Sequence, residues 1–393
     1  MIDPSFLYDE ILTEEEKQII DTAKEFGGEY FTEDSVRLWY EEGGVPNHVM
    51  EAYRDTGLGL LGLTPRLGGV RASFTAQAMV VETLSKYAGA ALPMQSQISC
   101  MNVMSRFARE DQIKTMLDAY AKTAYPGFSL AFADDETGSD FQSYKTAVFK
   151  EGGTYILRGR KAFVNNGMFM PNVLVIAKNM VDYDDILTAP FNIWLVPRTQ
   201  EGVSAYPINT IGQRITPASA LKFDNVELDP SWQIGTEELS PQNIFELSQI
   251  VRTMTCANSL GMAQAALEDA VTYSQTHVIR NRPIATFQQI AEMLVDMQID
   301  VSNIRTMLYE ATYAIDKGAE KIPLVVSLLK KYAPSAAVRV ADKAIQIFGG
   351  VGYTDSTRVS RIWIDSRANQ IIGGTDQIMT ILGAKGIAKY YSK

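Results

Sequence analysis

A polar segment near the C-terminus interrupts sequence that otherwise has helical periodicity. In IIGGTDQIM, residues 371–379, the pair Gly373 and Gly374 precedes a threonine, an aspartate and a glutamine. Paired glycines allow a backbone to take positive φ or to approach a bulky group closely, and the polar side chains can hydrogen-bond that group. A loop that caps a helix has the same composition. The segment alone therefore leaves ligand contact and structural turn as open alternatives.

A second glycine-rich segment could contact a phosphate group. In QIFGGVGY, Gln346 offers an amide, and Gly349, Gly350 and Gly352 allow close approach of the backbone. An isolated G-G-x-G is more often the end of a helix, so its meaning depends on the segments around it.

Helical elements at both ends of the chain must position these segments. Residues 12–122 place apolar residues at helical spacing in TEEEKQIIDTAKEF, QAMVVETLSKYAG and EDQIKTMLDAYAK, and Thr13 followed by glutamates is typical of a helix start. From about residue 241 onward, long periodic segments such as TFQQIAEMLVDMQIDVSNIRTMLYEATYAIDKG suit a helix bundle.

The middle of the chain has the pattern of a β domain. Short β-branched and aromatic runs recur in GFSLAFAD, TAVFKEGGTYILRGRKAFV, NVLVIAKN, FNIWLVP and ALKFDNVEL, and EGGTY at residues 151–155 is typical of a hairpin turn. We therefore expect an α+β fold with an N-terminal helical domain at 1–122, a central β domain at 123–235 and a C-terminal helical bundle at 236–393.

Composition excludes several classes of protein. The 393 residues carry a net charge of -10 without a basic run, which argues against a nucleic-acid surface. Two histidines cannot build a multi-histidine metal site, and we expect no metal. Cys100 and Cys256 are far apart in apolar contexts, which predicts buried reduced thiols in a cytoplasmic protein. No signal peptide or membrane span is predicted.

The order of the motifs resembles the acyl-CoA dehydrogenase family over nearly the whole chain. AFADDETGSD is similar to A-x-T-E-P-x-A-G-S-D, KAFVNNG to K-x-W-I-T-N-G, and GQRITPASALKFDNVEL to G-x-R-x-x-x-x-x-x-L-x-F-x-x-V. FQQIAEMLVDM is similar to F-Q-x-I-x-x-x-L-A-D-M, and QIFGGVGYT with SRIWIDSRANQIIGGTDQI to the family's two C-terminal motifs. The resemblance implies a β-barrel-like middle domain and a C-terminal four-helix bundle, with FAD held between them.

The resemblance assigns residues to the flavin ring. Phe132, Ala133 and Ser139 fall where the family lines the isoalloxazine and the acyl thioester. Phe163 stands in place of the Trp that packs on the flavin, and Asn165 in place of the Thr that hydrogen-bonds N5. Both replacements keep an aromatic plane and a polar group, and polar groups near the ring tune its electronics.

The resemblance also assigns a dinucleotide end. Gln346, Gly349 and Gly350 fall in the family's Q-x-x-G-G-x-G-Y motif, and Thr375 and Gln377 fall near the cofactor. The family meets the pyrophosphate and adenine side with an Arg-x-x-Phe-Gly run from a neighbouring subunit. Here HVIRN gives His277 for the Arg and Arg280 for the Phe, so Arg280 or Arg282 must supply the cation that offsets the diphosphate.

The usual catalytic base is absent. The family removes the α-proton of its acyl-CoA with a Glu at one of two positions that converge in space. One corresponds to Gly373 and the other to Val251, which precedes Arg252, and neither is acidic. Glu246, about one and a half turns earlier, would serve as base after a register change, although a solvated carboxylate at a helix start is the simpler interpretation.

Three interpretations of this absence stay open. Glu246 replaces the base, or the chain is an enoyl-CoA reductase or dehydrogenase with a non-standard base. GGTDQIMTILGAKGIAKYY looks most like the crotonobetainyl-CoA reductase branch, which keeps its Glu. The third is a family member that does not dehydrogenate, such as a desulfinase-like enzyme or a subunit whose site a partner chain completes. A non-catalytic subunit that binds FAD structurally is a further hypothesis.

The resemblance implies a short, polar acyl-CoA as substrate. PMQSQISCM, residues 93–101, falls as a loop where the family lines the acyl pocket, and Gln95 belongs to its polar side chains. We count Gln95, Ser139, Val251, Arg252, Gly373 and Gly374 as the substrate-binding residues. The expected partner is an electron-transferring flavoprotein, and the expected assembly is a homotetramer, as a dimer of dimers, or a hetero-oligomer.

A cluster of charges in RIWIDSR has a structural interpretation. Arg361, Asp365 and Arg367 are predicted to form an ion-pair network between helices rather than to contact a ligand.

Overall fold

The computed structural model describes residues 11–123, 128–235 and 241–392. The chain divides into two compact units, which consist of Met1–Glu42, Ala72–Gln95 and Val251–Lys393 (unit 1), and of Gly43–Arg71 and Ser96–Ile250 (unit 2). The two boundaries between the three predicted domains adjoin residues 124–127 and 236–240, which lie outside the described residues, and they stay a prediction.

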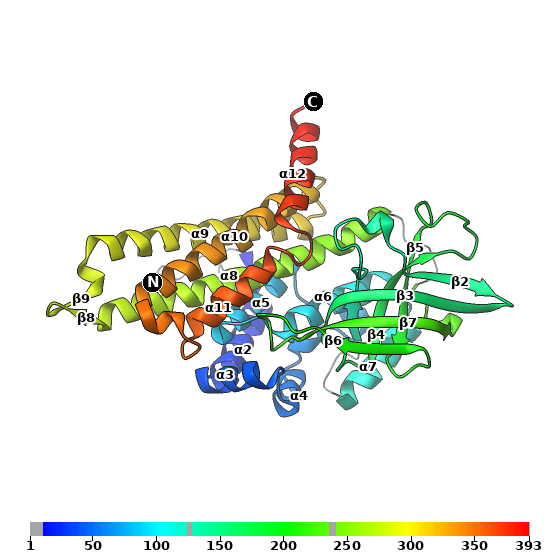
Figure 1. The fold of residues 1–393 in the computed structure, drawn as a ribbon, viewed down its shortest axis with the longest axis horizontal. Coiled ribbons are helices and arrows are strands. Elements are labelled where there is room, and N and C mark those ends of the chain that lie inside the picture. The colour runs from blue at the N-terminus through cyan, green and yellow to red at the C-terminus, as the bar shows by residue number, and fades with distance from the viewer. Residues whose placement is uncertain (1–10, 124–127, 236–240, 393) are drawn as a thin grey trace. The chain divides into compact units, whose positions relative to one another are not determined.

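Unit 1 is built from helices. They are α2 (Glu14–Tyr30), α3 (Glu33–Glu42), α5 (Phe74–Ala88), α9 (Gln288–Asp316), α10 (Ile322–Phe348), α11 (Arg358–Asn369), α12 (Asp376–Tyr391), and the greater part of α8 (Pro241–Thr276). Figure 1 shows α8, α9 and α10 as long neighbouring helices, and α10 packs against α9, α11 and α12. The predicted helix start at Thr13 is confirmed, because Thr13 and Glu16 form a reciprocal capping box.

The sequence of α8 explains its central place in unit 1. Every residue from Arg252 to Leu267 is buried, so the helix is covered on all sides rather than on one face. Alanine, glycine, serine and threonine dominate this stretch, and such small side chains let neighbouring helices approach closely. A Cβ on Gly261 would lie 2.2 Å from the carbonyl oxygen of Glu82, so α5 packs directly on the α8 backbone.

Unit 2 combines short helices with a sheet. Its helices include α4 (Asn47–Asp55), α7 (Glu110–Thr123) and most of α6 (Pro93–Phe107). Its strands are β1 (Phe128–Ala131), β2 (Ala147–Glu151), β3 (Thr154–Asn165), β4 (Asn172–Asn179), β5 (Phe191–Pro197), β6 (Val203–Pro207) and β7 (Ala218–Leu228). The sequence patterns anticipated these strands except β6, whose residues VSAYP were not recognised as a strand.

The sheet contains both parallel and antiparallel pairs. Its strands lie in the order β1-β4-β2-β3-β7-β6, and β5 also pairs with β4. Strand β4 pairs parallel with β1 and β2 and antiparallel with β5, and β3 pairs antiparallel with β2 and β7. The predicted hairpin turn is confirmed, because Glu151 faces Thr154 and both glycines between them have positive φ. The α+β fold, with helical domains on either side of a sheet domain in the sequence, is thus confirmed.

One local prediction is wrong. Residues 93–101 are not a loop, because they begin α6. The polar side chains suggested a loop, but they serve tertiary contacts. Gln97, for example, is buried and donates from Nε2 to the Gly59 carbonyl at 2.9 Å. No helix in the described part of the chain is long and apolar enough to cross a membrane.

Candidate functional site

The Gly373-Gly374 pair forms the turn between α11 and α12. Gly373 has φ +71° and Gly374 has φ +117°, so both occupy conformations that other residues rarely adopt. Thr375 caps α12, since its Oγ1 accepts a hydrogen bond from the Ile378 N–H at 3.3 Å. The turn therefore caps a helix. The positive φ of its two glycines would also allow the backbone to contact a ligand.

Two buried cations hold the carbonyls of this turn. Arg252 donates from Nε to the Gly373 carbonyl at 2.8 Å. Lys330, from α10, donates from Nζ to the carbonyls of Asn369 at 2.8 Å and Gly374 at 3.0 Å. Lys330 is fully buried, and burial lowers the pKa of its ammonium to about 8. Burial likewise lowers the pKa of Arg252 to about 10.

The sequence contained a signal for Lys330 that its analysis missed. Lys330 and Lys331 follow VVSLL in an otherwise apolar helix, and only one of two adjacent residues can face solvent. Lys331 is exposed and Lys330 is buried. A lysine on the buried face of a helix requires acceptors for its ammonium, and the turn supplies them.

Hydrogen bonds fix the start of the turn as well. The Asn369 side chain donates to Asn258 Oδ1 at 2.8 Å and to Ser259 Oγ at 3.0 Å, which ties the end of α11 to α8. The Gln370 amide and the Ser335 hydroxyl of α10 meet at 2.8 Å. The turn is thus held from α8 and from α10 by buried polar groups.

The N–H groups of the turn point to a chemical role. Within residues 241–392, no hydrogen bond is formed by the N–H groups of Gly373, Gly374 or Thr375. Consecutive free N–H groups around positive-φ glycines can cradle an anionic oxygen or a polarised carbonyl. The turn can therefore bind a carbonyl oxygen by backbone donors alone.

The two positions expected to carry a base converge, and neither supplies a carboxylate. A Cβ on Gly373 would lie 3.6 Å from Val251 Cγ1 and 3.5 Å from Arg252 Cγ. The other polar groups described here carry no charge: Gln95 Nε2 of α6 donates to Thr255 Oγ1 at 3.3 Å, and that hydroxyl donates to the Val251 carbonyl. The predicted substrate residues Gln95, Val251, Arg252, Gly373 and Gly374 are thus brought together in unit 1.

Glu246 lies elsewhere on α8. It lies five positions before Val251 in the sequence, which corresponds to a rotation of about 140° around a helix. Its carboxylate forms an ion pair with Arg106 at 3.3 Å, and the Glu246 side chain is 41% exposed. Its role as a base stays a prediction, and its contacts are those of a solvated carboxylate.

The end of α10 has the open surface that a dinucleotide would need. A Cβ on Gly349 or Gly350 would meet no atom within 4 Å, and Gln346, one turn earlier, is exposed. Arg280 lies in the turn between strands β8 (Val278–Ile279) and β9 (Arg282–Pro283) and is also exposed. Gln377 is exposed on the first turn of α12.

An aromatic stack joins the Arg280 hairpin to the glycine segment. The His277 ring stacks on Tyr273 with centroids 4.9 Å apart, and Tyr273 stacks on Phe348 at 4.2 Å. His277 directly follows α8 and precedes the hairpin, and Phe348 directly precedes Gly349. Sequence analysis missed Tyr273, since an aromatic residue at helical spacing is by default a core residue.

In unit 2, Phe163 stands out by its conformation and exposure. It has φ +54° beside a bulge in the β3–β7 ladder, and 68% of its surface is exposed. Such strain at a large aromatic residue marks functional sites. Asn165 ends β3, and no hydrogen bond of its side chain is formed within residues 128–235. An exposed aromatic plane beside a free amide fits the edge of a flavin ring.

A buried lysine fixes the segment that precedes this edge. Lys161 Nζ donates to the Phe132 carbonyl at 2.7 Å and lies 2.8 Å from Asp134 Oδ1. Burial lowers the pKa of Lys161 to about 8. The Ala133 carbonyl accepts from the Ala162 N–H at 3.1 Å, so residues 132 and 133 are held against β3. Ser139 is exposed in the loop that follows.

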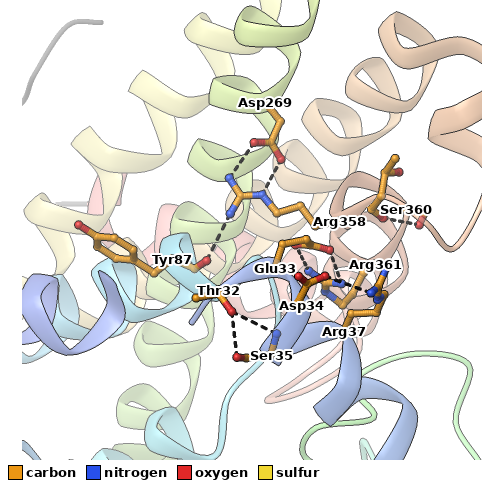
Figure 2. Close-up of polar contacts among 11 residues, drawn as sticks. Thr32, Glu33, Asp34, Ser35, Arg37, Tyr87, Asp269, Arg358, Ser360 and Arg361 are labelled. Carbon is orange, nitrogen blue, oxygen red and sulfur yellow. Dashed lines mark hydrogen bonds and ion pairs between the residues drawn. The ribbon is translucent and has the colours of Figure 1, made fainter. Parts of the chain in front are cut away.

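The charges of α11 are largely structural. Figure 2 shows Arg361 paired through both Nη atoms with Glu33, and Arg358 paired with Asp269. Asp365 accepts hydrogen bonds from the Tyr40 hydroxyl and the Ala91 N–H. Arg367 is exposed and forms no ion pair within the described residues. These contacts fit the predicted structural role of Arg361 and Asp365 and do not extend it to Arg367.

Comparisons with known proteins bear on the whole chain. Three family models match it: acyl-CoA dehydrogenase N-terminal domain at residues 13–124, middle domain at 129–226 and C-terminal domain at 246–388. A relative named probable acyl-CoA dehydrogenase YdiO, from Escherichia coli K12, is 31% identical over 380 residues, which cover 97% of this chain and 98% of the relative.

Solved structures have the same fold. An acyl-CoA dehydrogenase from Slackia heliotrinireducens is 35% identical with a TM-score of 0.86, over 97% of this chain and 98% of that one. A glutaryl-CoA dehydrogenase from Mycobacterium smegmatis, in complex with FADH2, is 21% identical with a TM-score of 0.87, over 98% and 97%. From the family models and the relatives of more than 30% identity, we conclude that the chain belongs to the acyl-CoA dehydrogenase family of flavoprotein oxidoreductases.

Proposed function

We propose that this chain is an FAD-dependent oxidoreductase that exchanges a hydride with a short, polar acyl-CoA thioester, as a dehydrogenase or an enoyl-CoA reductase. The observation that carries the proposal is the Gly373-Gly374 turn, whose N–H groups are free while its carbonyls are bound to buried cations. A thioester carbonyl is a ligand that such a turn suits, because backbone donors stabilise the negative charge that develops on its oxygen.

The residues that we propose to hold FAD are those implied by the family resemblance. They are Phe132, Ala133, Ser139, Phe163 and Asn165 in unit 2, and Arg280, Gln346, Gly349, Gly350, Thr375 and Gln377 in unit 1. FAD, when bound, would supply the hydride acceptor or donor for the acyl Cβ. Exposed Phe163 and the open space beside Gly349 and Gly350 support this fit.

The chain's own contribution is to orient and polarise the thioester. The N–H groups of Gly374 and Thr375 would donate to its carbonyl oxygen, which acidifies the α-proton and stabilises an enolate-like charge. Gln95 and Thr255 would offer polar contacts for a short acyl group. Nearby Val251 gives the site an apolar side chain where the family places a carboxylate.

The missing carboxylate favours a second candidate. The chain would then carry out a family reaction that needs no α-proton abstraction, as a desulfinase-like enzyme does, or would depend on a partner chain. Gly373 and Val251 support this candidate because a positioned base contributes about 100-fold to 10,000-fold in rate. Glu246, paired with Arg106, remains the carboxylate nominated as an alternative base.

An anaerobic titration separates the candidates. Purified protein is expected to contain FAD, and its flavin absorbance is followed as short acyl-CoA thioesters are added. In a second series, the flavin is first reduced and enoyl-CoA thioesters are added. Bleaching in the first series or recovery of colour in the second supports hydride exchange. An oxidised spectrum with every acyl-CoA, together with no reoxidation by any enoyl-CoA, would leave the second candidate.

We further propose an electron-transferring flavoprotein as redox partner and a homotetramer as the assembly. Exposed apolar side chains on α9 and α12, among them Val295, Ile299, Ile381 and Ile387, support self-association. Light scattering should give about four times 43.5 kDa, and a monomer would contradict the proposed assembly. The two free, buried cysteines support a location in the reducing cytoplasm.

A further inference from the structure

Two consecutive peptide groups of the α11–α12 turn are oriented by buried cations. The carbonyl of Gly373 accepts a hydrogen bond from Arg252 Nε at 2.8 Å, and the carbonyl of Gly374 accepts one from Lys330 Nζ at 3.0 Å. Arg252 is 7% exposed and Lys330 is 0% exposed, so water competes weakly for these bonds.

Fixing a carbonyl also fixes the N–H group of the same peptide. In a planar trans peptide, C=O and N–H point in opposite directions. The peptide after Gly373 carries the Gly374 N–H, and the peptide after Gly374 carries the Thr375 N–H. Because Arg252 and Lys330 draw both carbonyls toward α8 and α10, both N–H groups must point away from these cations.

We propose that Lys330, acting together with Arg252, is a positioning residue that sets the direction of the Gly374 and Thr375 N–H groups and so prepares the turn for its ligand. The inference rests on the proposed function, because the ligand considered is the acyl-CoA thioester. Within the described residues, Lys330 Nζ donates hydrogen bonds only to the backbone carbonyls of Asn369 and Gly374, so its effect passes through the turn.

The environment of Lys330 makes its charge sensitive to pH. The charged or titratable groups that act on it are Cys256 and Arg252 from α8, and Asp376 from the start of α12. Burial is the largest influence and lowers the pKa of Lys330 to about 8. Above that pH the ammonium loses its charge, and its bonds to the carbonyls lose their charge-assisted strength.

The experiment compares Lys330→Met with Lys331→Met in FAD-loaded protein. Lys331 is the matched control, since it is the next residue of α10 but is exposed. The first measurement is hydrogen exchange of residues 368–378. The second is the dissociation constant of acetyl-CoA by calorimetry at pH 7 and pH 9. Acetyl-CoA is chosen because it has no Cβ and cannot exchange a hydride.

The expected result is selective. Lys330→Met should speed exchange in the turn at least about tenfold and weaken acetyl-CoA at least about tenfold at pH 7, whereas Lys331→Met matches the natural protein. The natural protein should bind acetyl-CoA more weakly at pH 9 than at pH 7, and Lys330→Met should show no such change. Equal exchange and equal affinity in the two variants would overturn the inference.

Two further arms cover other outcomes. If Lys330→Met does not fold, the natural protein and Lys331→Met still give the test, because exchange in the turn must accelerate between pH 7 and pH 9 beyond the intrinsic rise measured for α8 peptides. No such excess would overturn the inference. If the natural protein binds no acyl-CoA, the proposed function fails, while the exchange comparison still decides whether Lys330 orients the turn.

Discussion

In two regions of the molecule a fully buried lysine holds backbone carbonyls, but within the described part of the chain only one of the two lysines is paired with a carboxylate. In unit 2, fully buried Lys161 holds the Phe132 carbonyl and pairs with Asp134. In unit 1, fully buried Lys330 holds two carbonyls of the turn, and no ion pair joins it to a carboxylate within residues 241–392. Both regions contain residues with positive φ near the predicted ligand contacts.

The difference assigns the two lysines different tasks. Lys161 and Asp134 neutralise each other, so their pair fixes the backbone without leaving a net charge. Lys330 and Arg252 bring two cations to the turn, beside the position for which the family resemblance implies a carboxylate. We infer that the Lys161 pair is a neutral support for its own segment of unit 2, whereas the turn in unit 1 is an electropositive cradle that lacks a carboxylate.

The largest effect is expected from giving the turn the anion it lacks. Val251→Glu places a carboxylate beside Arg252 and close to Gly373. Anaerobic flavin reduction by a short acyl-CoA should accelerate by at least about 100-fold, the lower range for a positioned general base. Val251→Gln is the control of equal size, and it should leave the rate unchanged. If Val251→Glu is no faster than Val251→Gln, the missing base is not what limits the reaction.

The second effect breaks the neutral pair in unit 2. Asp134→Asn leaves Lys161 as an uncompensated buried cation, which is expected to cost about 3–5 kcal/mol in the free energy of unfolding. The double variant Asp134→Asn with Lys161→Met removes the orphaned charge and should recover part of this loss. Urea unfolding of the three proteins measures both values. An Asp134→Asn protein as stable as the natural one would show that the pair does not fix this segment.

The third effect is a pH dependence with a definite sign. Burial lowers the pKa of Lys330 to about 8 in the folded chain, from an ordinary lysine value of 10.5. Between these values the unfolded chain holds a proton that the folded chain has lost, so the free energy of unfolding rises with pH. Below pH 8 both states are protonated and the contribution is constant. Lys161 contributes in the same direction.

The measurement is denaturant unfolding from pH 7.5 to about pH 9.5, where Lys330 should contribute roughly 2 kcal/mol. Lys330→Met should lose its share of the rise and keep the share of Lys161. Identical slopes in the two proteins would mean that the Lys330 ammonium does not titrate as its burial implies.

The smallest effect is expected at Glu246. It is exposed, paired with Arg106, and rotated by about 140° from Val251 along α8. Glu246→Gln should therefore change the rate of flavin reduction by less than about twofold, as expected for an exposed ion pair. Arg106→Gln serves as the control that breaks the same pair. A loss of more than tenfold in Glu246→Gln alone would restore Glu246 as the base.

The sequence predicts the order of helical and sheet domains, because hydrophobic periodicity and turn glycines are local signals. It also predicts that Val251 and Gly373 converge, since that follows from the resemblance. It does not reveal β6, whose residues are half-exposed, or the helix at residues 93–101, whose polar side chains are used in tertiary contacts.

The residues that support the site could not be identified from the sequence, for a related reason. Lys330, Tyr273 and Asp134 act through partners that are distant in the chain, and neither periodicity nor motif spacing names those partners. The position of Lys330 on the buried face of α10 was visible, but its acceptors in the turn could be identified only from the structure.

The most direct test of the account is a crystal structure of the FAD-loaded protein with a bound acyl-CoA thioester. We expect the thioester oxygen within hydrogen-bonding distance of N–H groups in residues 373–375, with their carbonyls still on Arg252 and Lys330. We also expect no carboxylate of this chain within about 4 Å of the α-carbon, the range over which a base acts. A carboxylate facing the α-carbon, or a thioester oxygen bound away from the turn, would contradict the account.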